Sequence, residues 1–296
     1  MRVLGREDRD LIIPDYSPLW FWVRAREEIR IRKESGESFP WTVDPILSKF
    51  RFCNVRREDD RVTIWVRENI RDSFAGHPLL WLMLCIARQV NWPDTLADLM
   101  ISETWPSEAS FTPPDMTRTL NRRKAQGSKV YTGAYMISAP AVKGSDKQAY
   151  IAETVIGDLW TRRTTFPAVG GRSLRGVHAW IRQTNGWGPF MAYQAVVDMR
   201  FTEILDHAPD ISTWAAAGPG TLRGLNRVWG RPLATPVSQE QALDEMKLIF
   251  ERVTQETGVI LDFSDVPNIL CETDKYLRVK LGQGTPRALY VPGRGA

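Results

Sequence analysis

Cysteine and histidine are scarce in this chain of 296 residues, which contains three of each. The six residues are Cys53, Cys85, Cys271, His77, His178 and His207. The cysteines are odd in number and far apart, which argues against a disulfide framework. There is also no CxxC pair, no HExxH motif and no cluster of cysteine with histidine. We therefore expect no metal ion held by the protein alone.

Long apolar runs are absent too. The longest, LLWLMLCIA, covers residues 79–87 and is far shorter than the roughly 20 residues that cross a bilayer. The first ten residues, MRVLGREDRD, are too charged for the apolar part of a secretory signal. The sequence therefore predicts a buried helix at 79–87 and a cytoplasmic protein without a membrane partner.

The common nucleotide-binding and hydrolase motifs do not occur. The chain has no GxxxxGK[ST] loop, no GxGxxG after a strand and no GxSxG elbow. These absences make a phosphate-loop kinase, a dinucleotide oxidoreductase and an α/β-hydrolase poor interpretations of this sequence.

Positive charge is concentrated in one window of the chain. The formal net charge is only +4, yet residues 118–185 contain twelve lysines and arginines against three acids. This window therefore carries +9, and the rest of the chain sums to −5. Such a window is typical of a surface that binds a phosphate-rich partner, although a basic face without a partner would give the same pattern.

Helix punctuation predicts a mainly α fold. Ser17 and Pro18 can start a helix that Gly36 ends, and Asp44 with Pro45 can start a short one. Further helices are expected from about 54 to 70, over the apolar run, after Pro93, near 147–160 and at 173–184. We allow one small β-hairpin near 130–137.

The length suggests one globular unit with two lobes. The Ser, Thr and Pro-rich stretch SETWPSEASFTPPDM is the best candidate for a linker. The expected division is an N-terminal helical lobe at 1–101, a linker at 102–117, and a basic region with a second helical lobe at 118–296. We expect the last helix of that lobe to return to the functional site.

The segment FRFCNVRREDDRVTIWV, residues 50–66, is the first candidate for a site. On a helix, Asn54, Arg57, Glu58 and Arg61 would form one stripe, with Asp60 beside it. Exposed ion pairs along a helix would explain the pattern equally well. The large apolar side chains on both sides predict instead that the charges are partly buried, and buried charge requires a partner.

Three other segments carry candidate site residues. In TNGWGPFMAYQAVVDMRF, Gly186 and Gly188 form a turn before a helix that begins at Pro189 and carries Asp198. Such a glycine turn can present backbone N–H groups to a DNA phosphate, as in a helix-hairpin-helix, but it also fits a tight turn between packed helices.

In AAAGPGTLRGLNRVWG, residues 215–230, free backbone is combined with fixed positive charge, which suits a phosphate group; a loop between helices is the alternative. In VPNILCETDKYLRVKLG, residues 266–282, polar groups recur on a helix that also has core positions. The candidates in these two segments are Gly218, Gly220, Arg223, Glu272, Lys275, Tyr276 and Arg278.

Taken together, these segments resemble the alpha-glutamyl/putrescinyl thymine pyrophosphorylase family, most closely its second clade. The resemblance is carried by WTVDPILSKFRFCNVRREDDRVTIWVRENIRD, LWLMLCIARQVNWPDTL, KVYTGAYMI, GWGPFMAYQAVVDMRF, AAAGPGTLRGLNRVWGR and LCETDKYLR, in the family's order. The helical domain of that family is shared with phage 5-hydroxymethyluracil DNA kinases. One departure is Thr273, where the family tends to have Phe after Cys-Glu.

The resemblance implies a two-lobed helical fold similar to helix-hairpin-helix DNA glycosylases, and an enzyme of phage DNA hypermodification that works in the bacterial host cell. Such a transferase lets an amine displace pyrophosphate from 5-pyrophosphoryloxymethyl-deoxyuridine in DNA. Its partners are the modified DNA and an amine donor, for which glycine, another amino acid and a polyamine such as putrescine all stay open. No cofactor is expected, apart from Mg²⁺ that could arrive with the pyrophosphate.

Roles for the candidate residues follow as hypotheses. Glu58, Asp198 or Glu272 would take a proton from the attacking ammonium group. Substrate and pyrophosphate would be bound by Asn54, Arg57, Asp60, Arg61, Arg223, Lys275, Tyr276 and Arg278. DNA backbone would be bound at Gly186, Gly188, Gly218 and Gly220. The alternatives are a non-catalytic helix-hairpin-helix DNA-binding protein and a glycosylase that excises modified thymine.

Overall fold

The computed structural model describes residues 13–102, 105–107, 111–132, 146–167, 172–286 and 288–291. Over these ranges the chain is helical and forms no sheet, and the β structure consists of one antiparallel bridge between Phe50 and Leu289. The predicted mainly α fold is confirmed. Likeness to helix-hairpin-helix glycosylases stays a prediction.

Local sequence signals start and end many of the helices. Asp44 accepts hydrogen bonds from the N–H groups of Ile46 and Leu47 at the start of helix α2 (Pro45–Lys49). Five of the described helices have proline as their first residue, where its missing N–H costs nothing: α2, α5 (Pro93–Ile101), α6 (Pro113–Ala125), α10 (Pro189–Arg200) and α11 (Pro219–Val228). Helix α12 (Gln239–Thr257) ends at Gly258 in the left-handed conformation.

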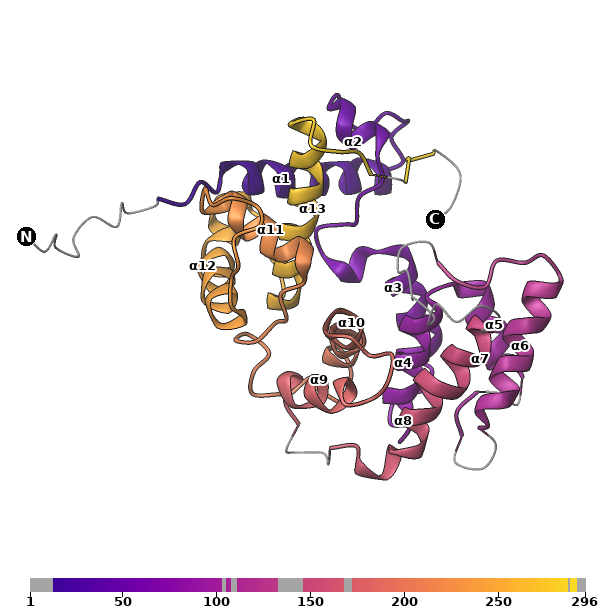
Figure 1. Ribbon diagram of the computed structural model, residues 1–296. Helices are drawn as coiled ribbons and strands as arrows, with labels where there is room; N and C mark the ends of the chain where they lie inside the picture. Colours follow the sequence, from indigo (N-terminus) through magenta and orange to yellow (C-terminus); the bar gives the residue numbers. More distant parts are fainter. Residues whose placement is uncertain are drawn as a thin grey trace, which may run out of the picture. The chain divides into compact units, whose positions relative to one another are not determined.

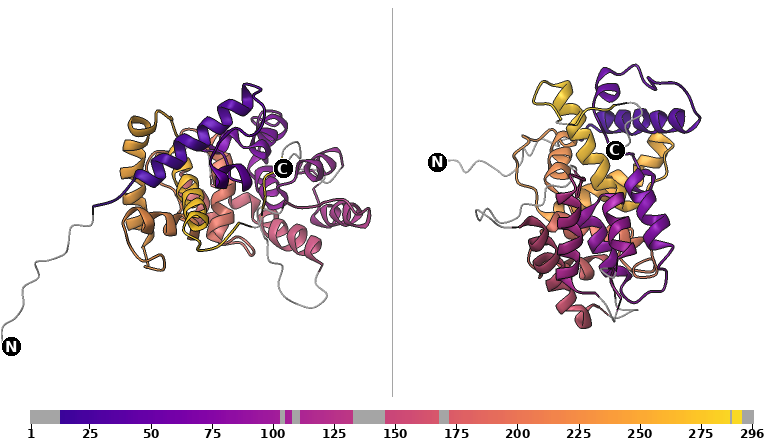
Figure 2. Two further views of the ribbon diagram at one scale, coloured as in Figure 1. Left: turned by 90° about the horizontal axis from the view of Figure 1, so that it is seen from above. Right: turned by 90° about the vertical axis from the view of Figure 1, so that its right-hand side faces the viewer.

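The chain divides into two compact units. Unit 1 comprises Met1–Val55 with Ala217–Gly295, and unit 2 comprises Arg56–Ala216. Unit 1 therefore joins the two ends of the sequence, as the indigo and the orange to yellow helices of Figures 1 and 2 show.

Unit 1 is built around the last helix of the chain, α13 (Val266–Lys280), which packs on α1 (Ser17–Glu34), α2 and α11. A short turn, η5 (Phe263–Asp265), leads into it. The packing of α11 on α13 is close because Gly224 of α11 faces the chain of α13. A Cβ atom at Gly224 would lie 2.4 Å from the carbonyl oxygen of Leu270.

Unit 2 packs around α4 (Leu80–Val90), in which every residue is buried. Its other helices are η1 (Arg57–Asp59), α3 (Arg61–Val66), η2 (Arg67–Arg71), α5, α6, α7 (Lys147–Ala149), η3 (Tyr150–Ile156), α8 (Gly157–Thr161), η4 (Arg163–Thr165), α9 (Leu174–Arg182) and α10. All of these except η1, α7 and η4 contribute apolar side chains to this core. Among the described residues, no helix combines the length and the apolar character that would let it span a membrane.

The structure corrects the helix expected from 54 to 70. The backbone is extended at Arg56 and Asp60, with ψ angles of 133° and 132°, and the α-helix begins only at Arg61. Asn54, Arg57, Glu58 and Arg61 therefore do not lie on one helical stripe. The following turn, η2, is a π-helix in which the N–H of Asp72 donates to the carbonyl of Arg67.

The packing units also differ from the lobes expected at 1–101 and 118–296. The described part of the expected linker at 102–117 contributes Trp105, Phe111 and Met116 to the core of unit 2. Prolines and serines mark loops locally, whereas the division depends on contacts between distant segments. The hairpin expected near 130–137 lies mostly outside the described residues, and residues 130–132 form no strand.

Candidate active site

The candidate residues lie in both units, and each set is described within its own unit. In unit 2 the set is centred on Asp198, on the buried side of α10, whose side chain has no exposed surface. Arg88 of α4 pairs with both of its carboxylate oxygens, one through Nε and the other through Nη2 at 2.5 Å. Arg88 also donates to Thr63 and Asn91. Both charges are thus buried and hydrogen-bonded together.

Arg57 approaches the same carboxylate from η1. Its Nη2 atom lies 3.6 Å from Oδ1 of Asp198 and donates to the carbonyl of Gln194 at 3.1 Å. Its Nη1 atom donates to the side chain of Gln194. Because these contacts hold the guanidinium against α10, Arg57 is only 9% exposed.

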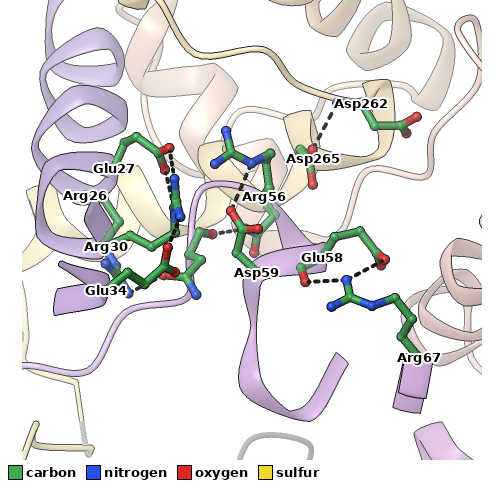
Figure 3. Close-up of polar contacts among 12 residues, drawn as sticks. Arg26, Glu27, Arg30, Glu34, Arg56, Glu58, Asp59, Arg67, Asp262 and Asp265 are labelled. Atoms are coloured by element: carbon green, nitrogen blue, oxygen red, sulfur yellow. Dashed lines mark hydrogen bonds and ion pairs between the residues drawn. The ribbon is translucent and has the colours of Figure 1, made fainter. Parts of the chain in front are cut away.

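Glu58, the next residue, pairs with Arg71, the third buried arginine of this set. Its Oε2 atom accepts from Nη2 of Arg71 at 2.5 Å, and Arg67 lies 3.8 Å away on the exposed side. Figure 3 shows Glu58 turned toward Arg67, and Asp59 turned back toward Arg56, with which it forms an ion pair of 2.9 Å. Glu58 keeps 24% of its side chain exposed, more than Asp198.

The pKa of Asp198 reflects two opposing effects. Burial by itself raises the pKa, but the positive charges of Arg88, Arg57 and Arg71 outweigh it and hold the pKa below the usual value. Asp198 therefore stays ionised. A fully buried, ionised carboxylate that is bound by two arginines is suited to fixing those arginines in place.

Two further candidates of unit 2 lie at the start of α3. Asp60 is the residue that precedes the helix, and its backbone carbonyl accepts from the N–H of Ile64. Arg61 is exposed. It is therefore placed to meet a partner in solution, whereas Arg57 is held inside.

In unit 1, Glu272 of α13 fixes the chain that leads away from α2. Its carboxylate accepts from the backbone N–H of Cys53 at 3.1 Å and pairs with Lys275 at 3.0 Å. The neighbouring Asn54 accepts from Arg26 at 2.6 Å through its side chain, and its carbonyl accepts from Asn268. These contacts connect α1, residues 53–54 and α13.

Tyr276 and Arg223 make ion-pair or hydrogen-bond contacts within unit 1 as well. The Tyr276 hydroxyl donates to Asp44 at 2.7 Å; burial and this hydrogen bond raise the pKa of Tyr276 well above its usual value. Arg223 and Arg227 each donate to one oxygen of the buried Asp274, at 2.8 Å. Arg278 is half-buried near Gly284.

The four glycine candidates have different environments. Gly186 has a φ angle of +77°, and an added Cβ would lie 2.4 Å from Val155. Gly188 and Gly218 immediately precede α10 and α11, and nothing lies within 4 Å of an added Cβ at Gly188. Gly220, predicted to bind DNA backbone, lies inside α11, where a Cβ would lie 2.3 Å from Sγ of Cys271. Helix packing thus explains Gly220.

An open cavity of about 600 Å³ lies beside α11 in unit 1. Its lining includes Arg223, Asn226 and residues 233–237. Over the described ranges, no group of three or more His, Cys, Asp or Glu side chains is arranged to hold a metal ion.

Three important residues of unit 2 were missed from the sequence. Arg88, Arg71 and Gln194 all contact the predicted candidates. Arg88 gave a usable signal, because a single arginine follows the apolar run of a helix that is buried on all sides. Arg71 and Gln194 gave none, since their partners are set by packing alone.

Comparison with known proteins identifies the family. The model of the helical domain of 5-hmdU DNA kinase matches residues 14–285. A 5-hmdU DNA kinase of Bacillus phage SP10 is 26% identical over 220 residues, which make up 66% of this chain and 33% of that kinase. The match thus spans about a third of the relative's length, and no solved structure matches significantly. The chain belongs to the family of 5-hmdU DNA kinase helical domains.

Proposed function

We propose that the protein is a transferase of DNA hypermodification that attaches an amine to a pyrophosphorylated hydroxymethyluracil base. Membership of a family named for a kinase of this base in DNA supports the choice of substrate. The observation that carries the proposal is the arginine-rich cluster of unit 2. Arg57, Arg71 and Arg88 lie around two carboxylates, those of Glu58 and Asp198.

The proposed reaction is a displacement at the 5-methylene carbon of the base. The amine nitrogen forms a bond to this carbon, the bond from carbon to the pyrophosphate oxygen breaks, and its electron pair leaves with pyrophosphate. Positive charge placed where the leaving group gains negative charge speeds such a step. Arg57 and the exposed Arg61 are the candidates for this role, with Mg²⁺ accompanying the pyrophosphate.

A base must also accept the proton that the ammonium group of the donor loses to become the neutral, attacking amine. Glu58 is the best placed of the three predicted carboxylates, because it is partly exposed and lies next to Arg57 in the chain. Asp198 has no exposed surface and a lowered pKa, so its proposed role is to fix Arg88 and Arg57. Glu272 is held by Cys53 and Lys275 in unit 1.

Binding of DNA is assigned to the turn before α10. The first N–H groups of this helix have no partner in the helix itself, and the space beside Gly188 is open. Phe190, in the first turn, is 43% exposed and could stack on a base. Taking the base out of the duplex costs a few kcal/mol, which such contacts must offset.

The test is a transfer assay on DNA that contains the pyrophosphorylated base. The protein is incubated with this DNA and with glycine, other amino acids or putrescine, and the nucleosides are then analysed by mass spectrometry together with released pyrophosphate. New amine adducts with stoichiometric pyrophosphate are expected. The Arg57→Ala variant should lose about 10²-fold or more in rate, while Arg32→Ala, in an exposed ion pair of α1, should not.

Other outcomes would point to the alternatives. Abasic sites would identify a glycosylase, and retention of DNA without adducts would identify a binding protein. Transfer of phosphate from ATP to hydroxymethyluracil DNA would assign to this chain the activity for which its phage relative is named.

A further inference from the structure

In the contacts described above, the arginine cluster of unit 2 places Arg57, Arg71 and Arg88 around the carboxylates of Asp198 and Glu58. Asp198 is satisfied by Arg88 and Arg57, which leaves Glu58 as the carboxylate partner of Arg71. Arg67 lies on the other side of Glu58, and Arg200 lies with Arg71 near the ring of Phe201. Buried charges of one sign in excess are unfavourable unless an anion joins them.

Arg71 is the least satisfied member of this cluster. It is only 3% exposed, and of its three nitrogen atoms only Nη2 has a hydrogen-bond partner among the described residues. Its Nε and Nη1 atoms are buried without one, and so is Oε1 of Glu58. Arginine and carboxylate frequently pair through two parallel hydrogen bonds, whereas Arg71 and Glu58 form one.

The local backbone places Arg71 in the interior. It is the last residue of the π-helical turn η2, which follows α3 directly. Turns of this kind are rare and occur often at functional sites. Glu58, which pairs with Arg71, and Arg67 beside it are more exposed, with 24% and 39% of their side chains accessible.

We propose that Arg71 is an anion-binding residue, which receives a phosphate or diphosphate group through Nε and Nη1 when Glu58 is displaced from it. A phosphate group offers three oxygen atoms and more charge than one carboxylate, so it satisfies donors that Glu58 leaves unpaired. Identification of this anion with the pyrophosphate of the reaction rests on the proposed function. In that case binding of the anion also frees the Glu58 carboxylate to accept a proton.

The test measures binding of inorganic pyrophosphate and inorganic phosphate to the whole protein by calorimetry, without DNA. The wild-type protein should bind pyrophosphate, and Arg71→Gln should weaken this binding by about tenfold or more, because it removes charge-assisted hydrogen bonds. Arg71→Lys should retain part of the affinity. The matched control is Arg32→Gln, an exposed arginine of α1 paired with Glu28, which should bind as the wild type does.

Thermal unfolding separates binding from folding. Pyrophosphate should raise the Tm of the wild-type protein and of Arg32→Gln, and raise that of Arg71→Gln much less at the same concentration. A folded Arg71→Gln variant with wild-type affinity would overturn the inference, and so would a wild-type protein that binds no pyrophosphate at millimolar concentration. If Arg71→Gln does not fold, Arg71→Lys decides by the same comparison.

The transfer assay distinguishes this inference from the proposed function. Pyrophosphate binding that depends on Arg71 in a protein that forms no amine adduct would refute the proposed function and leave the inference intact. Amine transfer at the wild-type rate by a folded Arg71→Gln variant would refute the inference alone.

Discussion

Asp198 is a buried charge that fixes the positions of other buried charges. Its carboxylate has no exposed surface, and burial alone would favour its neutral form. The three arginines reverse this preference and lower the pKa. In return, the carboxylate fixes Arg88, which is itself 2% exposed, and orients Arg57 through a longer contact.

The Asp198→Asn variant should be less stable than the wild type by about 3–5 kcal/mol at pH 7, because Arg88 keeps its charge and loses its buried partner. The pKa of Asp198 is lower in the folded than in the unfolded protein, where it is about 3.9. Its contribution to stability is thus complete above about pH 4 and is lost as pH falls through the folded pKa. Urea unfolding at pH 7 and pH 3 should show the difference narrowing in acid.

The control for this prediction is Asp115→Asn, which removes one partner of the exposed pair with Arg118. Exposed pairs contribute at most about 1 kcal/mol, so this change should be small at both pH values. Equal stability of Asp198→Asn and the wild type at pH 7 would contradict the assigned role.

For individual residues, the sequence identified the charged side chains of the site but not their partners. Arg57, Glu58 and Asp198 were predicted as site residues, and the structure brings them together in unit 2. The pairing of Arg88 with Asp198 joins positions 110 residues apart. No local pattern encodes such a distance, because packing of α4 on α10 creates it.

Among the elements, helix ends were easier to predict than the path between helices. Prolines and an aspartate cap act on their own backbone, and helices do begin at Pro93 and Pro189 and after Asp44. The helix predicted from about 54 to 70 is wrong over residues 54–60, although the charged residues there have a helical spacing. There the side chain of Arg57 bonds to α10, and the backbone is extended on both sides of η1.

Replacement of two helical glycines by alanine should change the stability of the protein in opposite directions, because one glycine lies at a close helix contact and the other does not. Gly224→Ala should destabilise the protein by about 1–3 kcal/mol, because the new Cβ would lie 2.4 Å from the backbone carbonyl of Leu270 and the helices must move apart. Gly157→Ala, in α8, meets its nearest atoms at an ordinary 3.5 Å. It should be neutral or stabilising by up to about 1 kcal/mol, since alanine favours a helix.

Chemical denaturation of both glycine variants, read by circular dichroism, measures these differences. A Gly224→Ala protein as stable as Gly157→Ala would mean that the two helices can separate at little cost.

For the whole molecule, the division into units predicts what can fold alone. All members of the main apolar core, from Val66 to Ala208, lie in unit 2, which is one continuous segment. A fragment of residues 56–216 should therefore unfold cooperatively on heating. Residues 217–296 alone lack α1, on which α13 packs, and should show no cooperative transition. Loss of structure in the fragment of residues 56–216 would show that the core of unit 2 is not sufficient for this unit to fold alone.

The uneven distribution of charge along the chain predicts salt-dependent binding of DNA, which the small net charge alone would not predict. A protein of net charge +4 has little overall attraction for a polyanion, whereas the +9 of residues 118–185 can neutralise several phosphates at once. Four such contacts would reduce the affinity for duplex DNA about 10²-fold between 50 and 200 mM salt.

Arg175→Gln and Arg182→Gln, at exposed positions of α9, should each lower the slope of log affinity against log salt by about one. Arg32→Gln, in an exposed ion pair of α1, should leave it unchanged. Fluorescence anisotropy over a salt series measures all three slopes, and a slope near zero for the wild type would mean that the basic window does not bind phosphate.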